Sequence, residues 1–425
     1  MIPSRPYMSQ WDVLIIGSGA GGWVLALLLA PKGYKIAILE KQAEPQFPTR
    51  GEILQPNGLK ILHAIGMRSR LEQDTQHQWD RVHFCRAKDG KTLCTIHYKN
   101  LPPPFNTALI ILPEVMHRHF MAEAERFPNI QFFQGAQFES LLEANQQVVG
   151  VRATWQQQSL DFHAKVVIGG DGVASSVRAA LGIPCKTHLY SNGYLTTVIP
   201  RPRHSDNDLR FYTGKGIYFA MMPLDRERYY LMYMVPQHRQ EALKVKGMPW
   251  FKETVCALHA DLGALLEKPM LSSASHLSFR PAHRVRCRHW TANGCVLIGD
   301  AAHAMNPHVA QGRNAAMQDA WVLAAVLEDC FEKGDFSQAA LSRYETLRRP
   351  EIEALQSLAD ELTWLWESPW APVIWARERS FRTTHQDRAL HDKVLGTVSG
   401  VKVAPYNLYD RWRALHLWGP LQEEA

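Results

Sequence analysis

A short apolar run followed by three spaced glycines limits most strongly what this chain can fold into. The run is Val13 to Ile16, and Gly17, Gly19 and Gly22 follow it in the spacing G-x-G-x-x-G. A continuous apolar run is typical of a parallel strand covered on both faces. The glycines allow a tight turn, close approach of a pyrophosphate and close packing of a helix on the strand. We therefore predict a strand, a turn and a helix whose N-terminus binds phosphate.

An acidic residue follows at the distance that dinucleotide binding requires. Glu40 ends a second apolar run, Ile36 to Leu39, and lies 18 residues after Gly22. An acid at this place accepts hydrogen bonds from a ribose. Its charge would repel a 2′-phosphate, so NADP is disfavoured at this site, whereas NAD and FAD both remain. Ala20 and Lys41, beside the turn and the acid, are further candidate cofactor-binding residues.

Composition excludes several other classes of protein. The 425 residues are 46% hydrophobic, enough for one large core or two coupled ones. The net charge of +6 comes without a long run of like charge, so no nucleic-acid partner is expected. Seven scattered cysteines form no C-x-x-C pair, which indicates neither a metal site nor a disulfide framework and fits a cytoplasmic protein. Val13 to Ala30 has no charge over 18 residues, but four glycines interrupt it, so it is interpreted as strand, turn and helix rather than as a membrane span.

A second constellation lies far downstream, in "GCVLIGDAAHAMNPHVAQGRNAAMQDA", residues Gly294 to Ala320. The apolar run Cys295 to Ile298 ends in Gly299-Asp300. A carboxylate at a strand tip suits the hydroxyls of the ribityl chain that FAD has and NAD lacks. Gly312 then opens a helix whose free N–H groups would face a flavin ring that gathers negative charge.

These residues resemble the GD motif of the single-component FAD-dependent aromatic hydroxylases, the class A flavoprotein monooxygenases. Two other stretches resemble motifs of the same family. Ala164 to Ile183 resembles its DG motif, and Arg50 to Met67 resembles the segment whose arginine, here Arg50, contacts the cofactor. The resemblance implies that Asp171 and Gly172 lie near the pyrophosphate. Asp171 is equally suited to cap a helix from Val173 to Ala180.

The resemblance also assigns roles around the flavin ring. Asp300 would bind the ribityl chain, and Pro307 would lie beside the ring where oxygen is activated. His308, next to Pro307, is the candidate acid–base residue. His303 belongs to the ordinary "DAAH" of the motif and is expected to pack or cap.

Two departures from the family pattern carry expectations of their own. Ala310 stands where the family often has glycine, and alanine fits there only if the position keeps a negative φ. Pro113 replaces the arginine that usually opens the helix at that position, which leaves Arg118 as a candidate substitute.

The expected fold class is α/β, with a Rossmann-like FAD-binding domain, an inserted antiparallel-sheet substrate domain and C-terminal helices. The expected boundaries are 1–183 for the first part of the FAD-binding domain, with 80–100 on the substrate side, 184–283 for the substrate domain, mainly β, 284–335 for the GD motif and its helix, and 336–425 for the C-terminal helical region. Leu209 to Pro236 is expected to form strands broken at 214–216 and 223–227, whose tyrosines and methionines cover the flavin.

The tail holds four tryptophans between Glu361 and Arg382. Trp364 to Pro369 resembles the W-x-W-x-I-P signature of flavin-dependent halogenases, but it follows the GD-like region instead of preceding it. We interpret the match as chance. The cluster is expected to pack the C-terminal helices against the FAD-binding domain, and contact with substrate or a membrane surface remains an alternative.

The function implied by the resemblance is monooxygenation. NADH or NADPH would reduce FAD, O2 would form a flavin hydroperoxide, and one oxygen atom would pass to an aromatic or other electron-rich hydrophobic small molecule. The alternatives are a double-bond reductase of the geranylgeranyl reductase type, a halogenase, and a non-catalytic flavin-binding protein. No metal is required, and the chain is expected to act as a monomer or homodimer.

Overall fold

The computed structural model describes residues 10–45, 52–75, 78–201, 206–236, 253 and 278–415. An eight-stranded sheet carries the glycine-rich turn, with the main order β16-β17-β10-β1-β2-β7 and with β8 and β9 attached beside β10. Its strands are β1 (Gln10–Ile16), β2 (Ile36–Glu40), β7 (Ile130–Gln134), β8 (Gln137–Ala144), β9 (Gln147–Trp155), β10 (Gln158–Gly169), β16 (Thr291–Ala292) and β17 (Cys295–Leu297).

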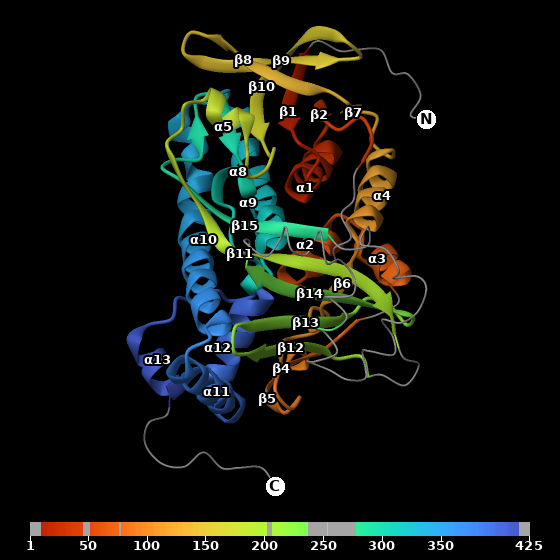
Figure 1. Ribbon diagram of the computed structural model, residues 1–425. Coiled ribbons are helices and arrows are strands. Elements are labelled where there is room, and N and C mark those ends of the chain that lie inside the picture. The colour runs from red at the N-terminus through yellow and green to blue at the C-terminus, as the bar shows by residue number, and fades with distance from the viewer. Residues whose placement is uncertain are drawn as a thin grey trace.

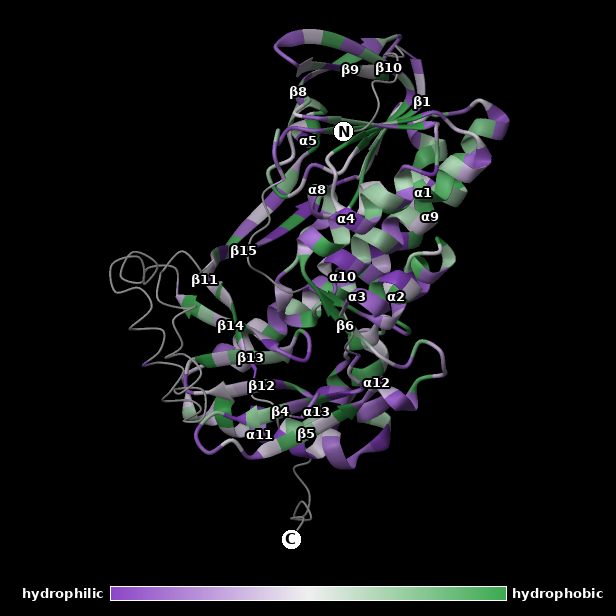
Figure 2. Cartoon of the chain, turned by 90° about the vertical axis from the view of Figure 1, so that its right-hand side faces the viewer, coloured by the Kyte–Doolittle hydropathy of each residue, from purple (hydrophilic) through white to green (hydrophobic). Residues whose placement is uncertain are grey.

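The order of these strands brings the two distant motifs together. β1 pairs in parallel with β2 and with β10, and β10 pairs in parallel with β17. The carboxyl ends of parallel strands lie at one edge of a sheet, so the glycine turn after β1 and the Gly299-Asp300 turn after β17 share that edge. β2 and β17 are buried along nearly their whole length, and β1 and β10 are buried toward their carboxyl ends. Hydrophobic residues run along β1 (Figure 2).

Two helices begin near this edge and pack against each other. α1 (Ala20–Leu29) follows the glycine turn, and α9 (Gly312–Lys333) follows the downstream motif. A Cβ added at Gly21 would lie 2.9 Å from the Ala316 carbonyl oxygen, so the glycine allows the two helices to approach. α10 (Gln338–Glu367) packs on α9 and contacts strands of both sheets (Figure 1).

A second sheet of seven strands has the order β15-β11-β14-β13-β12-β4-β5. Neighbours are antiparallel except β12 and β4, so the expected α/β architecture with a second, mainly antiparallel sheet is confirmed. The expected breaks at 214–216 and 223–227 are present. The strands are β4 (Arg81–Arg86), β5 (Thr92–His97), β11 (Cys185–Pro200), β12 (Leu209–Gly214), β13 (Ile217–Pro223), β14 (Arg228–Pro236) and β15 (Ser278–Cys287).

The remaining elements lie between the sheets, beside them and at the lower end of the molecule (Figure 1). β3 (Glu52–Leu54) pairs with β6 (Leu109–Ile111) as a separate ribbon. The other helices are α2 (Pro56–Ala64), α3 (Arg68–Thr75), α4 (Pro113–Ala124), α5 (Ser176–Ala180), α8 (Asp300–His303), α11 (Ala371–Gln386), α12 (Arg388–Ser399) and α13 (Leu408–Leu415), with short turns of 3₁₀ helix at η1 (Ala30–Lys32), η2 (Tyr98–Asn100) and η6 (Pro307–Val309). Within the ranges described, none of the helices has the length and apolar character needed to cross a bilayer.

The tryptophan-rich tail differs from the expectation. Trp366 is buried, but it packs on Phe84 and Tyr218 of the second sheet instead of on the nucleotide-binding sheet. Trp364, Trp370 and Trp375 are 60%, 68% and 54% exposed. The sequence pattern did not separate the one tryptophan that faces the sheet from the three that face solvent, because that depends on how α10 and α11 are rotated against it.

Candidate functional site

Two cavities meet at the glycine-rich turn. The larger, of 380 Å³, lies between the carboxyl edge of the first sheet and one face of the second sheet. The smaller, of 240 Å³, lies beside the end of β2. Gly19, Ala20 and Arg313 line both cavities. The two cavities therefore form an elongated site with the start of α1 at its middle, as a dinucleotide requires.

The glycine turn has the geometry that the motif predicts. Gly17 has a φ of 99°, and a Cβ there would lie 2.5 Å from the Gly170 carbonyl oxygen. Gly22 packs against the turn itself, since its Cβ would lie 2.8 Å from the Gly17 oxygen. At Gly19 the nearest atom to an added Cβ is 3.9 Å away, so this face of the backbone is open to a ligand.

Glu40 lies at the end of the smaller cavity. Its Oε2 atom accepts hydrogen bonds from the Ser18 N–H (3.1 Å) and the Ser18 hydroxyl (2.7 Å), and Oε1 accepts one from the Gln42 N–H (3.0 Å). The carboxylate is thus held where the sequence predicts a ribose acceptor. Lys41, next to it, is exposed and is not among the residues that line either cavity.

Aromatic side chains that the sequence analysis missed form the wall of the smaller cavity. Trp23 lies parallel to Phe120, with ring centroids 6.3 Å apart, and Phe132 lies 5.1 Å from Trp23. His117 belongs to the same group, and burial lowers the pKa of its ring, which favours the neutral form. A wall of this kind suits the flat face of an adenine. Trp23 directly follows the glycine motif, but its partners come from α4 and β7.

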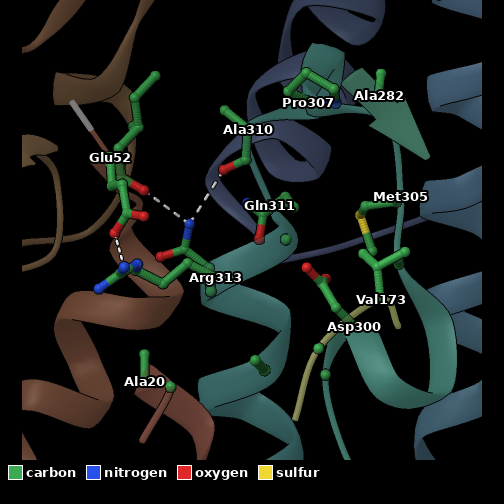
Figure 3. Close-up of a pocket in the computed structure, with 18 of the residues that line it drawn as sticks. Ala20, Glu52, Val173, Ala282, Asp300, Met305, Pro307, Ala310, Gln311 and Arg313 are labelled. Atoms are coloured by element: carbon green, nitrogen blue, oxygen red, sulfur yellow. Dashed lines mark hydrogen bonds and ion pairs between the residues drawn. The ribbon is translucent and has the colours of Figure 1, made fainter. Parts of the chain in front are cut away.

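The residues of the downstream motif line one side, here called the floor, of the larger cavity. Asp300 follows the Gly299 turn, is exposed to the cavity and points toward the start of α9 (Figure 3). Pro307 and Gly312 line the same cavity. A Cβ at Gly312 would meet nothing within 4 Å, so the first turn of α9 has open space in front of it.

A buried ion-pair network fixes this floor from behind. Asp319 accepts hydrogen bonds from the Gly299 N–H (3.0 Å) and the Arg348 Nε (2.9 Å), and it lies 2.6 Å from His303 Nε2. Burial raises the pKa of Asp319, but His303 and Arg348 lower it more, to about 2. His303 therefore packs and pairs, in line with the expectation. No sequence pattern pointed to Arg348, which lies 29 residues after Asp319 along the chain.

His308 lies behind the cavity wall. Its side chain is fully buried, lines a separate cavity of 30 Å³ and stacks on Tyr218 with ring centroids 4.7 Å apart. Its Nε2 atom is 2.9 Å from Glu367 Oε1, although the two are not aligned as a hydrogen bond. Tyr218 itself lines the larger cavity, and burial raises the pKa of its hydroxyl well above the usual value. An acid–base role for His308 stays a prediction.

Asp171 caps a helix at the edge of the site. Its Oδ2 atom accepts hydrogen bonds from the N–H groups of Ser176 (2.7 Å) and Val177 (3.1 Å), which are the first residues of α5. Gly172, with a φ of 84°, lines the larger cavity, whereas Asp171 is not among its lining residues. The capping interpretation is therefore supported, with a helix that begins three residues later than expected.

The arginines are arranged differently from the expectation. Arg50 lies outside the described residues. Arg118 is 66% exposed on the side of α4 and pairs with Asp74 at 3.3 Å, away from both cavities. Arg313, which the sequence analysis overlooked, lies where the cavities meet. One sequence feature could have identified it: Arg313 directly follows Gly312, where the helix that faces the flavin was predicted to begin.

Ala310 does not keep the negative φ that alanine was expected to need at this position. Ala310 has a φ of 50° and a ψ of 35°, the left-handed region, and its N–H bonds to the Pro307 carbonyl oxygen. The backbone must turn sharply there to start α9, and alanine does so at a cost that glycine would not incur.

Replacing Ala310 with glycine is therefore expected to raise the free energy of unfolding by about 1 kcal/mol. Urea unfolding followed by circular dichroism measures it. Ala325→Gly is the matched control, since Ala325 is exposed inside α9. That change should lower stability by about 1 kcal/mol. A loss of stability at both positions would contradict the strain argument.

Comparison with known proteins is consistent with this geometry. Residues 10–359 match the family model described as "FAD binding domain". The chain is 28% identical to 6-methylpretetramide 4-monooxygenase from Streptomyces rimosus, over 80% of this chain and 81% of that protein. It is 24% identical to kynurenine 3-monooxygenase from Salinispora arenicola, over 82% and 78% of the two chains.

Solved structures share the fold. A probable FAD-dependent monooxygenase from Pseudomonas aeruginosa superposes with a TM-score of 0.73 at 21% identity, covering 91% of this chain and all of that one. A p-nitrophenol 4-monooxygenase from Pseudomonas putida superposes with a TM-score of 0.76 at 17% identity, covering 91% and 97%.

Proposed function

This chain belongs to the FAD binding domain family, and from that premise we propose that it hydroxylates a neutral, largely apolar aromatic small molecule. It is an FAD-dependent monooxygenase that uses NAD(P)H and O2. The family relationship favours this activity over a double-bond reductase or a halogenase. The substrate class is the proposal, and the wall formed by the second sheet carries it.

The residues of the two cavities fit FAD. Glu40 and the aromatic wall of the smaller cavity suit adenosine, the open backbone at Gly19 suits the pyrophosphate, and Asp300 suits the ribityl hydroxyls. When bound, FAD supplies the redox chemistry, accepting hydride from NAD(P)H and activating O2. The chain itself has to bind, orient and shield the reactants.

The start of α9 provides the electrostatic part of this task. The N–H groups of a first helical turn have no partner within the helix, and here the helix begins at the cavity. Together with the helix dipole they stabilise negative charge that develops in front of them. Asp319 holds the Gly299 turn opposite, so the two sides of the ring site are fixed relative to each other.

The second sheet provides the substrate wall. Phe211, Tyr218, Met222, Tyr230 and Met232 come from three neighbouring strands and line the larger cavity on one face. All five are nearly buried, and none carries a charge at neutral pH. Such a wall binds apolar rings, excludes water and leaves tyrosine hydroxyls as hydrogen-bonding groups. It fits an aromatic substrate with few polar substituents better than an anionic one.

The activity is tested on purified enzyme with a panel of phenols and neutral polycyclic aromatics. We expect NAD(P)H oxidation that depends on the aromatic compound and on O2, with a product heavier by one oxygen atom. A reduced product formed under nitrogen would establish the reductase instead. Preference for carboxylated over neutral aromatics would overturn the proposed substrate class.

Replacing Asp300 with alanine is expected to weaken FAD binding by about 10- to 100-fold, since hydrogen bonds to a charged group contribute about 1.5–3 kcal/mol. Fluorescence titration of the apoprotein with FAD measures it. Asp329→Ala serves as the control. Asp329 lies near the C-terminal end of α9, whereas the cavity lies at its N-terminal end, and it pairs with Arg343 of α10. Unchanged FAD affinity in Asp300→Ala would remove this residue from the site.

A further inference from the structure

Arg313 lies at the point where the two cavities join. It is in the first turn of α9, and its side chain is 19% exposed. Of the described residues that line the two cavities, it is the one arginine, and no lysine is among them. Gly19 and Ala20, at the start of α1, are the other residues that both cavities share.

Glu52 pairs with this guanidinium from the side of β3. The two side chains form an ion pair at the edge of the larger cavity (Figure 3), and the Glu52 side chain is 9% exposed. Both backbones are fixed by Asn314, which accepts a hydrogen bond from the Gln55 N–H (3.1 Å) and donates one to the Ile53 carbonyl oxygen (2.9 Å). The guanidinium is therefore held at the junction.

The junction is where a bound dinucleotide has its charge. With adenosine beside Glu40 and the ribityl chain beside Asp300, the diphosphate would lie between them, at the start of α1. Its two negative charges would meet the free N–H groups of the helix there, and a cationic side chain beside them would add a charge-assisted hydrogen bond. Pro113, at the start of α4, is uncharged, and Arg118 lies on the surface, so neither residue provides a cation beside the diphosphate.

We propose that Arg313 binds the diphosphate of FAD and that Glu52 is a positioning residue that orients its guanidinium. The proposal rests on the proposed function, since it requires FAD in these cavities. A guanidinium presents donors in a rigid fork, so one edge can bind a carboxylate while another binds phosphate oxygens. Arg313 thereby contacts the cofactor in place of the family's arginine at position 113, which is Pro113 in this chain.

The test separates the diphosphate from the rest of the cofactor. Apoprotein is titrated with FAD and with riboflavin by fluorescence, and with ADP by calorimetry. Arg313→Ala is expected to weaken FAD and ADP binding by about 10- to 100-fold, as the loss of a charge-assisted bond predicts. Riboflavin has no phosphate, so its affinity should change less than about twofold. Arg313→Lys should recover part of the loss, because it keeps the charge without the fork.

Two controls make the result specific. Arg118→Ala removes an exposed arginine of α4 and should leave all three affinities unchanged. Glu52→Ala should weaken FAD binding less than Arg313→Ala, and the double variant should match Arg313→Ala alone, because Glu52 acts through the arginine. Each variant is checked for an unchanged melting temperature.

Three outcomes would overturn the inference. These are an unchanged FAD affinity in Arg313→Ala, an equal loss for riboflavin and ADP, and additive losses in the double variant. Failure of the proposed function looks different, since a reduced product or a preference for carboxylated aromatics would then be found in a chain whose FAD affinity still depends on Arg313.

Discussion

Replacing Asp319 with alanine is expected to lower the free energy of unfolding by about 3–5 kcal/mol, the largest loss among the single changes considered for this chain. The change leaves Arg348 buried without its main compensating charge and leaves the Gly299 N–H and His303 without an acceptor. Because Gly299 precedes Asp300, FAD should also dissociate more readily. Chemical unfolding and flavin retention on gel filtration measure the two effects.

Variants and pH distinguish this network from general damage to the core. Asp319→Asn keeps an acceptor oxygen but not the charge, so its loss should be intermediate. Glu351→Ala removes the half-buried second partner of Arg348 and should cost less than about 1 kcal/mol. The pKa of Asp319 is about 2 in the folded state, below the ordinary value of 3.8. The carboxylate therefore contributes its full stabilisation to the fold at pH values above 3.8, and this contribution is lost as the pH falls toward 2. An Asp319→Ala protein as stable as the unaltered chain would refute the assignment.

Alanine substitutions at two glycines of the same motif are expected to have different effects, one on stability and the other on FAD affinity. Gly17→Ala should lower the free energy of unfolding by about 2–5 kcal/mol, because it combines a left-handed conformation with a backbone clash. The φ there is 99°, and the added Cβ would lie 2.5 Å from the Gly170 oxygen. This loss should appear in the apoprotein, without any ligand.

Gly19→Ala is the matched variant. Its φ is −67°, and an added Cβ meets nothing closer than 3.9 Å, so stability should stay within about 0.5 kcal/mol. The methyl group would instead occupy the space at the junction of the cavities, and FAD affinity should fall. Melting temperatures of apoprotein and FAD titrations measure the pair. A stable Gly17→Ala, or a Gly19→Ala that binds FAD normally, would contradict the description of the turn.

The sequence determined the local elements and their order. Apolar runs specify β1, β2 and β17 because a parallel strand covered on both faces needs a continuous hydrophobic surface. Glycine spacing specifies the turn before α1, and the same reasoning placed Glu40 and Asp300 at strand tips. The chemistry of FAD and the family resemblance implied that these two residues share one site, and the parallel pairing of β1, β10 and β17 brings their strand ends to one edge.

Only the tertiary structure decided which side chains surround that site. Arg313 faces Glu52, Trp23 faces Phe120, and Asp319 faces Arg348. Each pair joins elements that are separate along the chain, and the periodicity of one helix does not reveal what packs against it. The left-handed φ of Ala310 was not evident from the sequence for a related reason, since the path from η6 into α9 imposes it despite the residue's own preference.

The chain's sequence thus sets where backbone turns and strand tips occur, because these depend on neighbouring residues and on excluded volume along the chain. The electrostatics of the site depend on charges brought together from distant segments, since the energy of an ion pair depends on its separation in space and on its burial. Both of those quantities are fixed only when the two sheets and the helices that contact them have packed.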